Sequence, residues 1–330
     1  MKVLACAALG LWGLMSPALA APPAAQPLDL ETVNRADLSS KDQKGISPAF
    51  IKAQVLLDRA RFSPGVIDGH NGENVQKALK AFEKARGLTV DGALDDETWT
   101  KLNEGSPDPI LVEYTIGEED VKGPFVKIPD KMEEQSELAK LGYSSPEELL
   151  AEKFHMDEEL LKTLNPGKRF DEAGTSIVVA NVGGPPEGDD LKGKVTKIEI
   201  VKSERVLRAL TEDGSLLAVY PASIGSEDKP APTGTFNVRA VVRNPDYTYN
   251  PDYAFKGVKA KEKFQIKPGP NNPVGTVWID LSVESFGIHG TPNPDKVGKS
   301  FSHGCARLTN WDVEELAGMV KKGTSVTFLE

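Results

Sequence analysis

Residues 286–310 of the chain read FGIHGTPNPDKVGKSFSHGCARLTN. This stretch holds a cysteine, Cys305, together with two of the chain's four histidines, His289 and His303. A thiol that attacks a carbonyl needs a base to take its proton, and the base needs a partner that orients it. The oxyanion that forms needs backbone N–H donors, which a small residue such as Gly304 leaves accessible. The stretch therefore has the parts of a cysteine acyl-transfer site.

The first 20 residues predict a cleavable signal peptide. Lys2 gives a positive start, an apolar run follows over residues 3–15, and Ala-Leu-Ala at residues 18–20 is a small-x-small cleavage site. The apolar run is too short to span a bilayer, so we expect export to the periplasm without a transmembrane anchor. Cleavage removes Cys6, the other of the two cysteines. Cys305 is then a lone thiol in an oxidising compartment, which indicates reactivity.

Length and composition describe an ordinary soluble protein of two or three domains. The chain has 330 residues, of which 39% are hydrophobic and 27% are charged. Its formal net charge of −10 argues against nucleic-acid binding, because that function needs a basic surface. The acidity by itself identifies no partner.

The N-terminal third predicts a flexible linker followed by a small all-α domain. Residues 21–45 begin with a proline- and alanine-rich run and offer little to bury. From residue 46 to residue 107, apolar residues recur at helical spacing, and the clearest series is Val75, Leu79 and Phe82. We expect Gly87 to end that helix and Asp95 to cap the next one.

The rest of the chain predicts a mixed α+β middle region and a β-rich C-terminal domain. Residues 108–182 show the order strand, helix, helix, strand, and residues 183–194 are a turn-rich acidic linker. Over residues 195–330 strand patterns dominate, and Glu-Asp-Gly at residues 212–214 predicts a hairpin turn. Residues 243–268 interrupt this last domain as an insertion over the expected cleft.

The stretch around Cys305 resembles the signature of the YkuD-type L,D-transpeptidases, which remodel bacterial peptidoglycan. The residues that carry the resemblance are His-Gly-Thr at 289–291 and Ser-His-Gly-Cys-Ala-Arg-Leu-Thr-Asn at 302–310. The resemblance implies that Cys305 is the nucleophile and that His289 is the general base, oriented by the backbone carbonyl of Gly290. It also implies that His303 lines the site and that the N–H groups of Gly304 and Cys305 form the oxyanion hole. The substrate-binding residues that it implies are Arg307, Ser302 and Asn310.

Two further resemblances concern the N-terminal half of the chain. The run AFEKARGL at residues 81–88 and the Val-Asp-Gly tail that leads to Trp99 resemble the three-helix peptidoglycan-binding module. A helical spacer without a ligand is the alternative interpretation. Leu-Asn-Pro-Gly at residues 164–167 resembles the end of the second helix of a LysM carbohydrate-binding module. The polar insertion at residues 120–141 departs from that family.

These resemblances imply a periplasmic enzyme that needs no cofactor and acts on the peptide stems of peptidoglycan. The thiol would displace the terminal D-alanine of a tetrapeptide stem, and an amine of a neighbouring stem would resolve the thioester to give a 3-3 cross-link. Water or a lysine of an outer-membrane lipoprotein is an alternative acceptor that the sequence does not separate from the stem amine. Two other hypotheses are a zinc site formed by His289, His303 and Cys305, and a wall-binding scaffold without catalysis.

Overall fold

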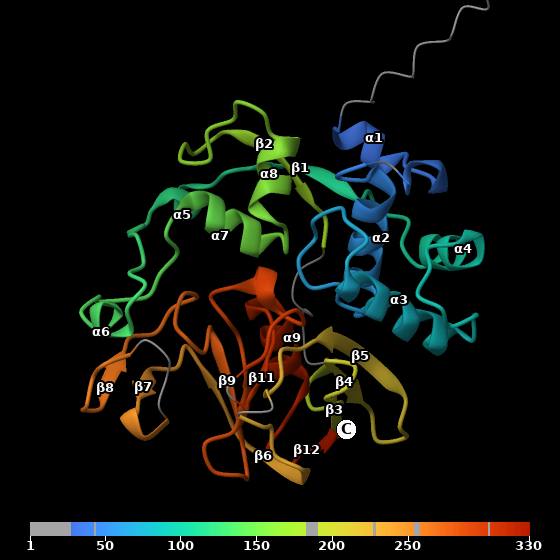
Figure 1. Ribbon diagram of the computed structural model, residues 1–330. Helices are drawn as coiled ribbons and strands as arrows, with labels where there is room; N and C mark the ends of the chain where they lie inside the picture. The colour runs from blue at the N-terminus through green and yellow to red at the C-terminus, as the bar shows by residue number, and fades with distance from the viewer. Residues whose placement is uncertain (1–27, 43, 183–190, 227–228, 254–257, 303) are drawn as a thin grey trace, which may run out of the picture.

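The computed structural model describes residues 28–42, 44–182, 191–226, 229–253, 258–302 and 304–330. Figure 1 shows a helical N-terminal part in blue, a middle part in green and a β-rich part in yellow to red. The predicted signal peptide lies outside the described residues, as do residues 183–190 of the predicted second linker. Within the described ranges, no helix is long and apolar enough to cross a membrane.

The N-terminal part is helical, as the apolar spacing predicted. Its elements are α1 (Leu30–Asn34), the 3-10 turn η1 (Leu38–Ser40), α2 (Pro48–Arg59), α3 (Glu73–Arg86) and α4 (Asp96–Glu104). Gly87 ends α3 in the left-handed conformation with φ of 71°, which glycine adopts at little cost. The carboxylate of Asp95 caps α4 by accepting a hydrogen bond of 2.8 Å from the N–H of Thr98. Both predicted helix boundaries are therefore confirmed.

Residues 28–42 are ordered against the rest of the protein, so the prediction of a flexible linker over 21–45 is wrong for this segment. Val33 in α1 is fully buried. The Asn34 amide donates to the carbonyl of Leu111 at 3.0 Å and accepts from the N–H of the same residue at 2.8 Å. The contact joins residues that are 77 positions apart. The amino-acid composition of residues 21–45 could not predict this contact, because the contact depends on the single polar side chain of Asn34.

The middle part has the predicted order of strand, two main helices and strand. Its elements are β1 (Leu111–Thr115), α5 (Glu118–Val121), α6 (Met132–Gln135), α7 (Pro146–Lys153), α8 (Glu158–Leu164) and β2 (Ser176–Ala180). Strands β1 and β2 pair antiparallel. The polar insertion at residues 120–141 contains α6, where Glu133 accepts hydrogen bonds from the N–H groups of Lys259 and Ala260 at 3.0 and 3.3 Å. The insertion of the middle part therefore contacts the insertion of the C-terminal part.

The N-terminal and middle parts share one hydrophobic core rather than forming two independent domains. Phe50 and Leu79 from the helices belong to the same buried cluster as Leu161 and Val179 from the middle part. That cluster also reaches Val219 in the C-terminal part, whose backbone carbonyl accepts from the N–H of Ser63 at 2.9 Å. The boundary predicted at residue 107 therefore separates two stretches of sequence but not two cores.

The C-terminal part is built on an eight-stranded sheet with the order β11-β10-β9-β6-β12-β3-β4-β5. The strands are β3 (Lys197–Val201), β4 (Val206–Leu210), β5 (Leu216–Pro221), β6 (Gly234–Arg243), β9 (Val277–Leu281), β10 (Gly287–His289), β11 (Ala306–Arg307) and β12 (Ser325–Leu329). The predicted hairpin turn at 212–214 joins the antiparallel pair β4 and β5. Helix α9 (Asn310–Met319) packs against β9 and β10.

The insertion at residues 243–268 forms a small separate hairpin. Its strands are β7 (Tyr247–Tyr249) and β8 (Phe264–Ile266), which pair antiparallel, and the 3-10 turn η3 (Pro251–Tyr253) lies between them in the sequence. Another 3-10 turn of the C-terminal part, η4 (Pro294–Lys296), lies outside the insertion.

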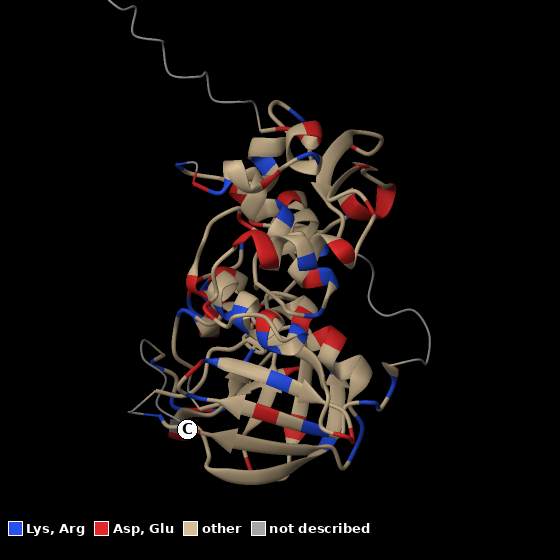
Figure 2. Ribbon diagram, turned by 90° about the vertical axis from the view of Figure 1, so that its right-hand side faces the viewer, with Lys and Arg blue, Asp and Glu red and all other residues tan. Residues whose placement is uncertain are grey.

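In the view of Figure 2, Lys and Arg positions are interspersed with Asp and Glu and form no continuous basic stripe on the described ribbon. This mixed distribution is consistent with the net charge of −10.

Asn165→Ala should destabilise the middle part. Asn165 is 3% exposed, and its amide accepts from the N–H of Val178 at 2.6 Å and donates to its carbonyl at 2.8 Å. Alanine leaves these buried groups without partners, which costs about 2 kcal/mol. We expect a lower midpoint of thermal unfolding followed by circular dichroism. The exposed Lys168→Ala serves as the control, and equal midpoints for the two variants would contradict the prediction.

Candidate active site

Two short parallel strands bring the predicted nucleophile and the predicted base to the same edge of the sheet. Strand β10 ends at His289 and pairs with β11, so that His289 lies opposite Arg307. Cys305 directly precedes β11. The N–H of Leu308 donates to the carbonyl of His289 at 2.9 Å and extends the pairing. His303, the second predicted histidine of the site, lies outside the described residues.

The imidazole of His289 is buried and oriented by a backbone carbonyl, as predicted. Its side chain is 5% exposed, and its ring stacks on Trp278 with centroids 5.6 Å apart. Nδ1 lies 2.7 Å from the carbonyl oxygen of Gly290. Because a carbonyl can only accept, Nδ1 carries the proton, and Nε2 of the neutral ring is free to act as a base. Burial and the charge of Arg307 lower the pKa of His289 to about 3.

Burial favours the protonated form of the Cys305 thiol. Burial raises its pKa above the usual range, while the Gly287 N–H and the positive charge of Arg307 act in the opposite direction. The sulfur lies 3.8 Å from the carbonyl oxygen of Ser285. A raised thiol pKa beside a lowered imidazole pKa favours the neutral thiol and the neutral imidazole over a thiolate–imidazolium pair.

Arg307 supplies a partly buried positive charge beside Cys305 and His289. Its backbone N–H donates to the carbonyl of Ser223, and its carbonyl accepts from the N–H of Ser223, both at 2.9 Å. These two hydrogen bonds hold the backbone of Arg307 in place. Among the described residues, its Nε has no hydrogen-bond partner although the atom is buried. A partly buried guanidinium with an unused donor can bind a carboxylate.

Ser302 and Gly304 shape the turn that carries the thiol. The Ser302 hydroxyl donates to the carbonyl of Cys305 at 2.5 Å and accepts from the N–H of Gly304 at 3.1 Å. The predicted oxyanion donor Gly304 is therefore bonded to Ser302 in this state, and a substrate oxygen has to replace that bond. Gly304 has φ of 113°, and a Cβ atom there would lie 2.6 Å from the ring of Phe286. Only glycine fits this position without strain.

Asn310 holds loops together instead of presenting its amide to a substrate. It is 3% exposed and is the first residue of α9, which is capped by Thr309. Its Oδ1 accepts from the N–H groups of Thr276 and Thr291, and its Nδ2 donates to Glu152 and to the carbonyl of Pro270. Both atoms of the amide are occupied, so the structure gives Asn310 a supporting position and not the substrate contact that the resemblance implied.

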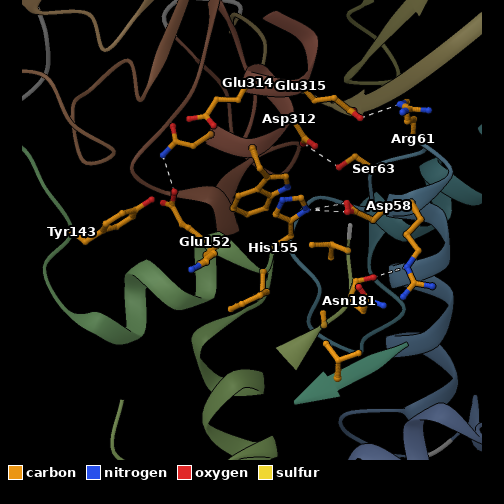
Figure 3. Close-up of a pocket in the computed structure, with 18 residues that line it drawn as sticks. Asp58, Arg61, Ser63, Tyr143, Glu152, His155, Asn181, Asp312, Glu314 and Glu315 are labelled. Carbon is orange, nitrogen blue, oxygen red and sulfur yellow. Dashed lines mark hydrogen bonds and ion pairs between the residues drawn. The ribbon is translucent and has the colours of Figure 1, made fainter. Parts of the chain in front are cut away.

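A cavity of about 660 Å³ lies next to this support, where the three parts of the chain meet (Figure 3). Its walls carry cross-domain pairs, among them His155 with Asp58 at 2.9 Å and Arg61 with Glu315 at 3.1 Å. Neither Cys305 nor His289 lines it. No sequence pattern predicts this junction, because these two pairs join residues that are 97 and 254 positions apart.

Comparisons with known proteins agree with the geometry. A sequence profile described as the YkuD L,D-transpeptidase catalytic domain matches residues 196–328, and one described as a putative peptidoglycan binding domain matches residues 47–102. A putative L,D-transpeptidase YkuD of Bacillus licheniformis is 32% identical over 182 residues, which cover 54% of this chain and 91% of the relative. A putative L,D-transpeptidase YkuD of Bacillus subtilis is 34% identical over 36% of this chain and 57% of its own length. The middle part lies outside both profile matches, so its LysM-like character stays a prediction.

Solved structures of similar proteins were also found. L,D-transpeptidase 3 from Mycobacterium tuberculosis is 19% identical with a TM-score of 0.34, over 42% of this chain and 61% of that chain. An L,D-transpeptidase from Enterococcus faecium is 21% identical with a TM-score of 0.32, over 42% of this chain and 50% of that chain. The present chain thus spans about half to three fifths of these two proteins.

Gly304→Ala should disable the site while leaving the fold intact. Alanine at φ of 113° is strained, and its Cβ displaces Phe286 and the turn that carries Cys305. We expect the rate of product formation to fall on the order of tenfold or more, because small displacements of reacting atoms are costly. Gly318→Ala is the matched control, since a Cβ at this helical position meets nothing within 4 Å. Equal activity of both variants would contradict the prediction.

The alkylation rate of Cys305 should depend on pH as expected for a protonated thiol. Iodoacetamide reacts with the thiolate, and the raised pKa of Cys305 keeps the thiolate scarce near neutrality. We expect the rate, followed by intact mass, to be still rising above about pH 8.5, the usual thiol pKa. A plateau reached near neutral pH would show a preformed thiolate–imidazolium pair and contradict this account of the resting site.

Proposed function

The chain belongs to the YkuD family of L,D-transpeptidases, and we propose that it cross-links peptidoglycan through a thioester on Cys305. The observation that carries this proposal is the hydrogen bond of 2.7 Å from His289 Nδ1 to Gly290, because it leaves Nε2 as a free base. This base lies on the strand next to the one that Cys305 precedes. The substrate is the amide between the third residue of a peptide stem and its terminal D-alanine.

Acylation begins with attack by sulfur and proton transfer in one step. The Cys305 proton moves to His289 Nε2 while the sulfur bonds to the amide carbon. The N–H groups of Gly304 and Cys305 hold the oxyanion once the substrate has displaced the Ser302 hydroxyl from Gly304. His289 then gives its proton to the nitrogen of D-alanine, the C–N bond breaks, and a thioester remains. Arg307 binds a carboxylate of the stem and so sets its direction.

Deacylation uses the same residues in reverse. An amine on the third residue of a neighbouring stem attacks the thioester carbon and loses a proton to His289. The C–S bond breaks, and the thiolate of Cys305 regains its proton from His289, so that the enzyme returns to its resting state. The product is a direct 3-3 cross-link. A lipoprotein lysine or water in place of the stem amine gives attachment of that protein or a shortened stem by the same steps.

The substrate and the N-terminal domain point to the same location. The match to a peptidoglycan binding domain over residues 47–102 supports binding of the enzyme to the wall that it modifies. The signal sequence at residues 1–20 supports export to the periplasm, where peptidoglycan is built. The chemistry needs no cofactor, because base, nucleophile and oxyanion donors all come from the chain.

Purified disaccharide-tetrapeptide incubated with the mature protein tests the proposal directly. Wild type should form a cross-linked dimer with loss of D-alanine, detected by mass spectrometry. Cys305→Ala and His289→Gln should lower the rate by three orders of magnitude or more, on the order seen when members of a catalytic unit are removed. Shortened tripeptide without dimer would assign water as the acceptor. Unchanged substrate with wild type would contradict the proposal for this donor.

A further inference from the structure

We propose that Glu152, on helix α7 of the middle part, is a positioning residue for the base His289 and acts through Asn310. The inference rests on the proposed function in one respect, since it takes His289 to be the base. It assigns the middle part, which matches neither known family profile, a role in the active site. Three contacts in series carry the argument.

The first contact joins Asn310 to the loop that orients the base. Gly290, whose carbonyl fixes His289 Nδ1, is followed by Thr291, and the N–H of Thr291 donates to Asn310 Oδ1 at 3.1 Å. Asn310 Oδ1 lies so close to Gly290 that a Cβ atom there would approach it to 2.3 Å. The position of the Asn310 amide therefore fixes the peptide that supplies the orienting carbonyl.

The second contact fixes the Asn310 amide itself. Its Nδ2 donates to Glu152 Oε2 at 3.0 Å and to the carbonyl of Pro270 at 3.2 Å. Without Glu152, one of the two Nδ2 hydrogens has no partner in this buried position, and only the bonds to Thr276, Thr291 and Pro270 still hold the amide. Glu152 is 8% exposed and lines the cavity where the three parts of the chain meet, and in Figure 3 it lies toward Tyr143.

The third contact anchors α7 on the catalytic part, one helical turn from Glu152. Glu148 Oε1 accepts from the Asn271 amide at 2.6 Å, so two carboxylates at i and i+4 bind two asparagines of the C-terminal part. The N–H of Leu141 donates to the carbonyl of Pro268 at 3.0 Å, and the N–H of Asn271 donates to the carbonyl of Leu141 at 3.0 Å. Helix α7 is thus a fixed support and places Glu152 reproducibly.

The protonation state of Glu152 fits its proposed role as a hydrogen-bond acceptor for the Asn310 amide. Burial raises its pKa to about 8, helped by the nearby Glu148 and Glu314, while hydrogen bonds from Asn310 and Tyr143 act in the opposite direction. At neutral pH the group is therefore mostly the neutral acid, with an oxygen that accepts from Asn310. Glutamine has the same shape and the same acceptor, whereas methionine has similar length and no acceptor oxygen.

The test compares Glu152→Met and Glu152→Gln with the exposed control Glu159→Ala on α8. Steady-state cross-linking gives kcat and KM. The proton on His289 Nδ1 is followed by NMR in ¹⁵N-histidine-labelled protein, assigned by its loss in His289→Gln. We expect Glu152→Met to lower kcat on the order of tenfold with KM changed less than about twofold, and to shift or broaden the Nδ1 proton signal. Glu152→Gln should match wild type in all three readouts.

The outcomes test the series of contacts from Glu152 through Asn310 to Gly290, here called the relay, separately from the proposed function. A wild-type protein without cross-linking activity would remove the proposed function, while the Nδ1 signal of Glu152→Met still tests the relay. An unchanged Nδ1 signal and kcat in folded Glu152→Met would overturn the relay. The relay also fails if kcat falls equally in Glu152→Met and Glu152→Gln. Should the methionine variant not fold, Glu152→Ala, which leaves room for water, takes its place in the same comparison.

Discussion

The hydrogen bond between His289 Nδ1 and the Gly290 carbonyl is the interaction on which the active site depends. It sets the tautomer of the imidazole and leaves Nε2 available for the thiol proton. A carbonyl carries no net charge, so it orients the ring without stabilising an imidazolium as strongly as a carboxylate would. Burial and the nearby Arg307 lower the pKa of His289 to about 3, and burial raises the pKa of Cys305, so both shifts favour the neutral forms of the two groups.

This charge state has a consequence for selectivity. In the proposed mechanism the thiol becomes nucleophilic only when a substrate oxygen reaches the oxyanion donors, which would protect it from other electrophiles in the compartment to which we propose it is exported. Substrate must also replace the bond between Gly304 and Ser302 before those donors are free. The proposed mechanism therefore couples activation of Cys305 to correct placement of the amide, and it uses the charge of Arg307 to guide a stem carboxylate there.

The local features that the sequence predicted are present in the structure, whereas its long-range contacts were not predicted. The Cys305 motif, the Gly290 carbonyl and the helix ends at Gly87 and Asp95 are local features, and residue type determines them directly. The flexible linker was wrong for residues 28–42, because the Asn34 contact with Leu111 spans 77 positions. Asn310 was assigned to substrate for the same reason: its partner Glu152 lies 158 positions away, and no periodicity or motif records such a pair.

The measurement that tests the account most directly is rapid-quench intact mass spectrometry of the enzyme mixed with a tetrapeptide donor and no acceptor. The account predicts a transient adduct of the stem lacking its terminal D-alanine, located on the peptide that contains Cys305 and absent from Cys305→Ala. Release of D-alanine by wild type without any such adduct would contradict a thioester on Cys305 and with it the mechanism.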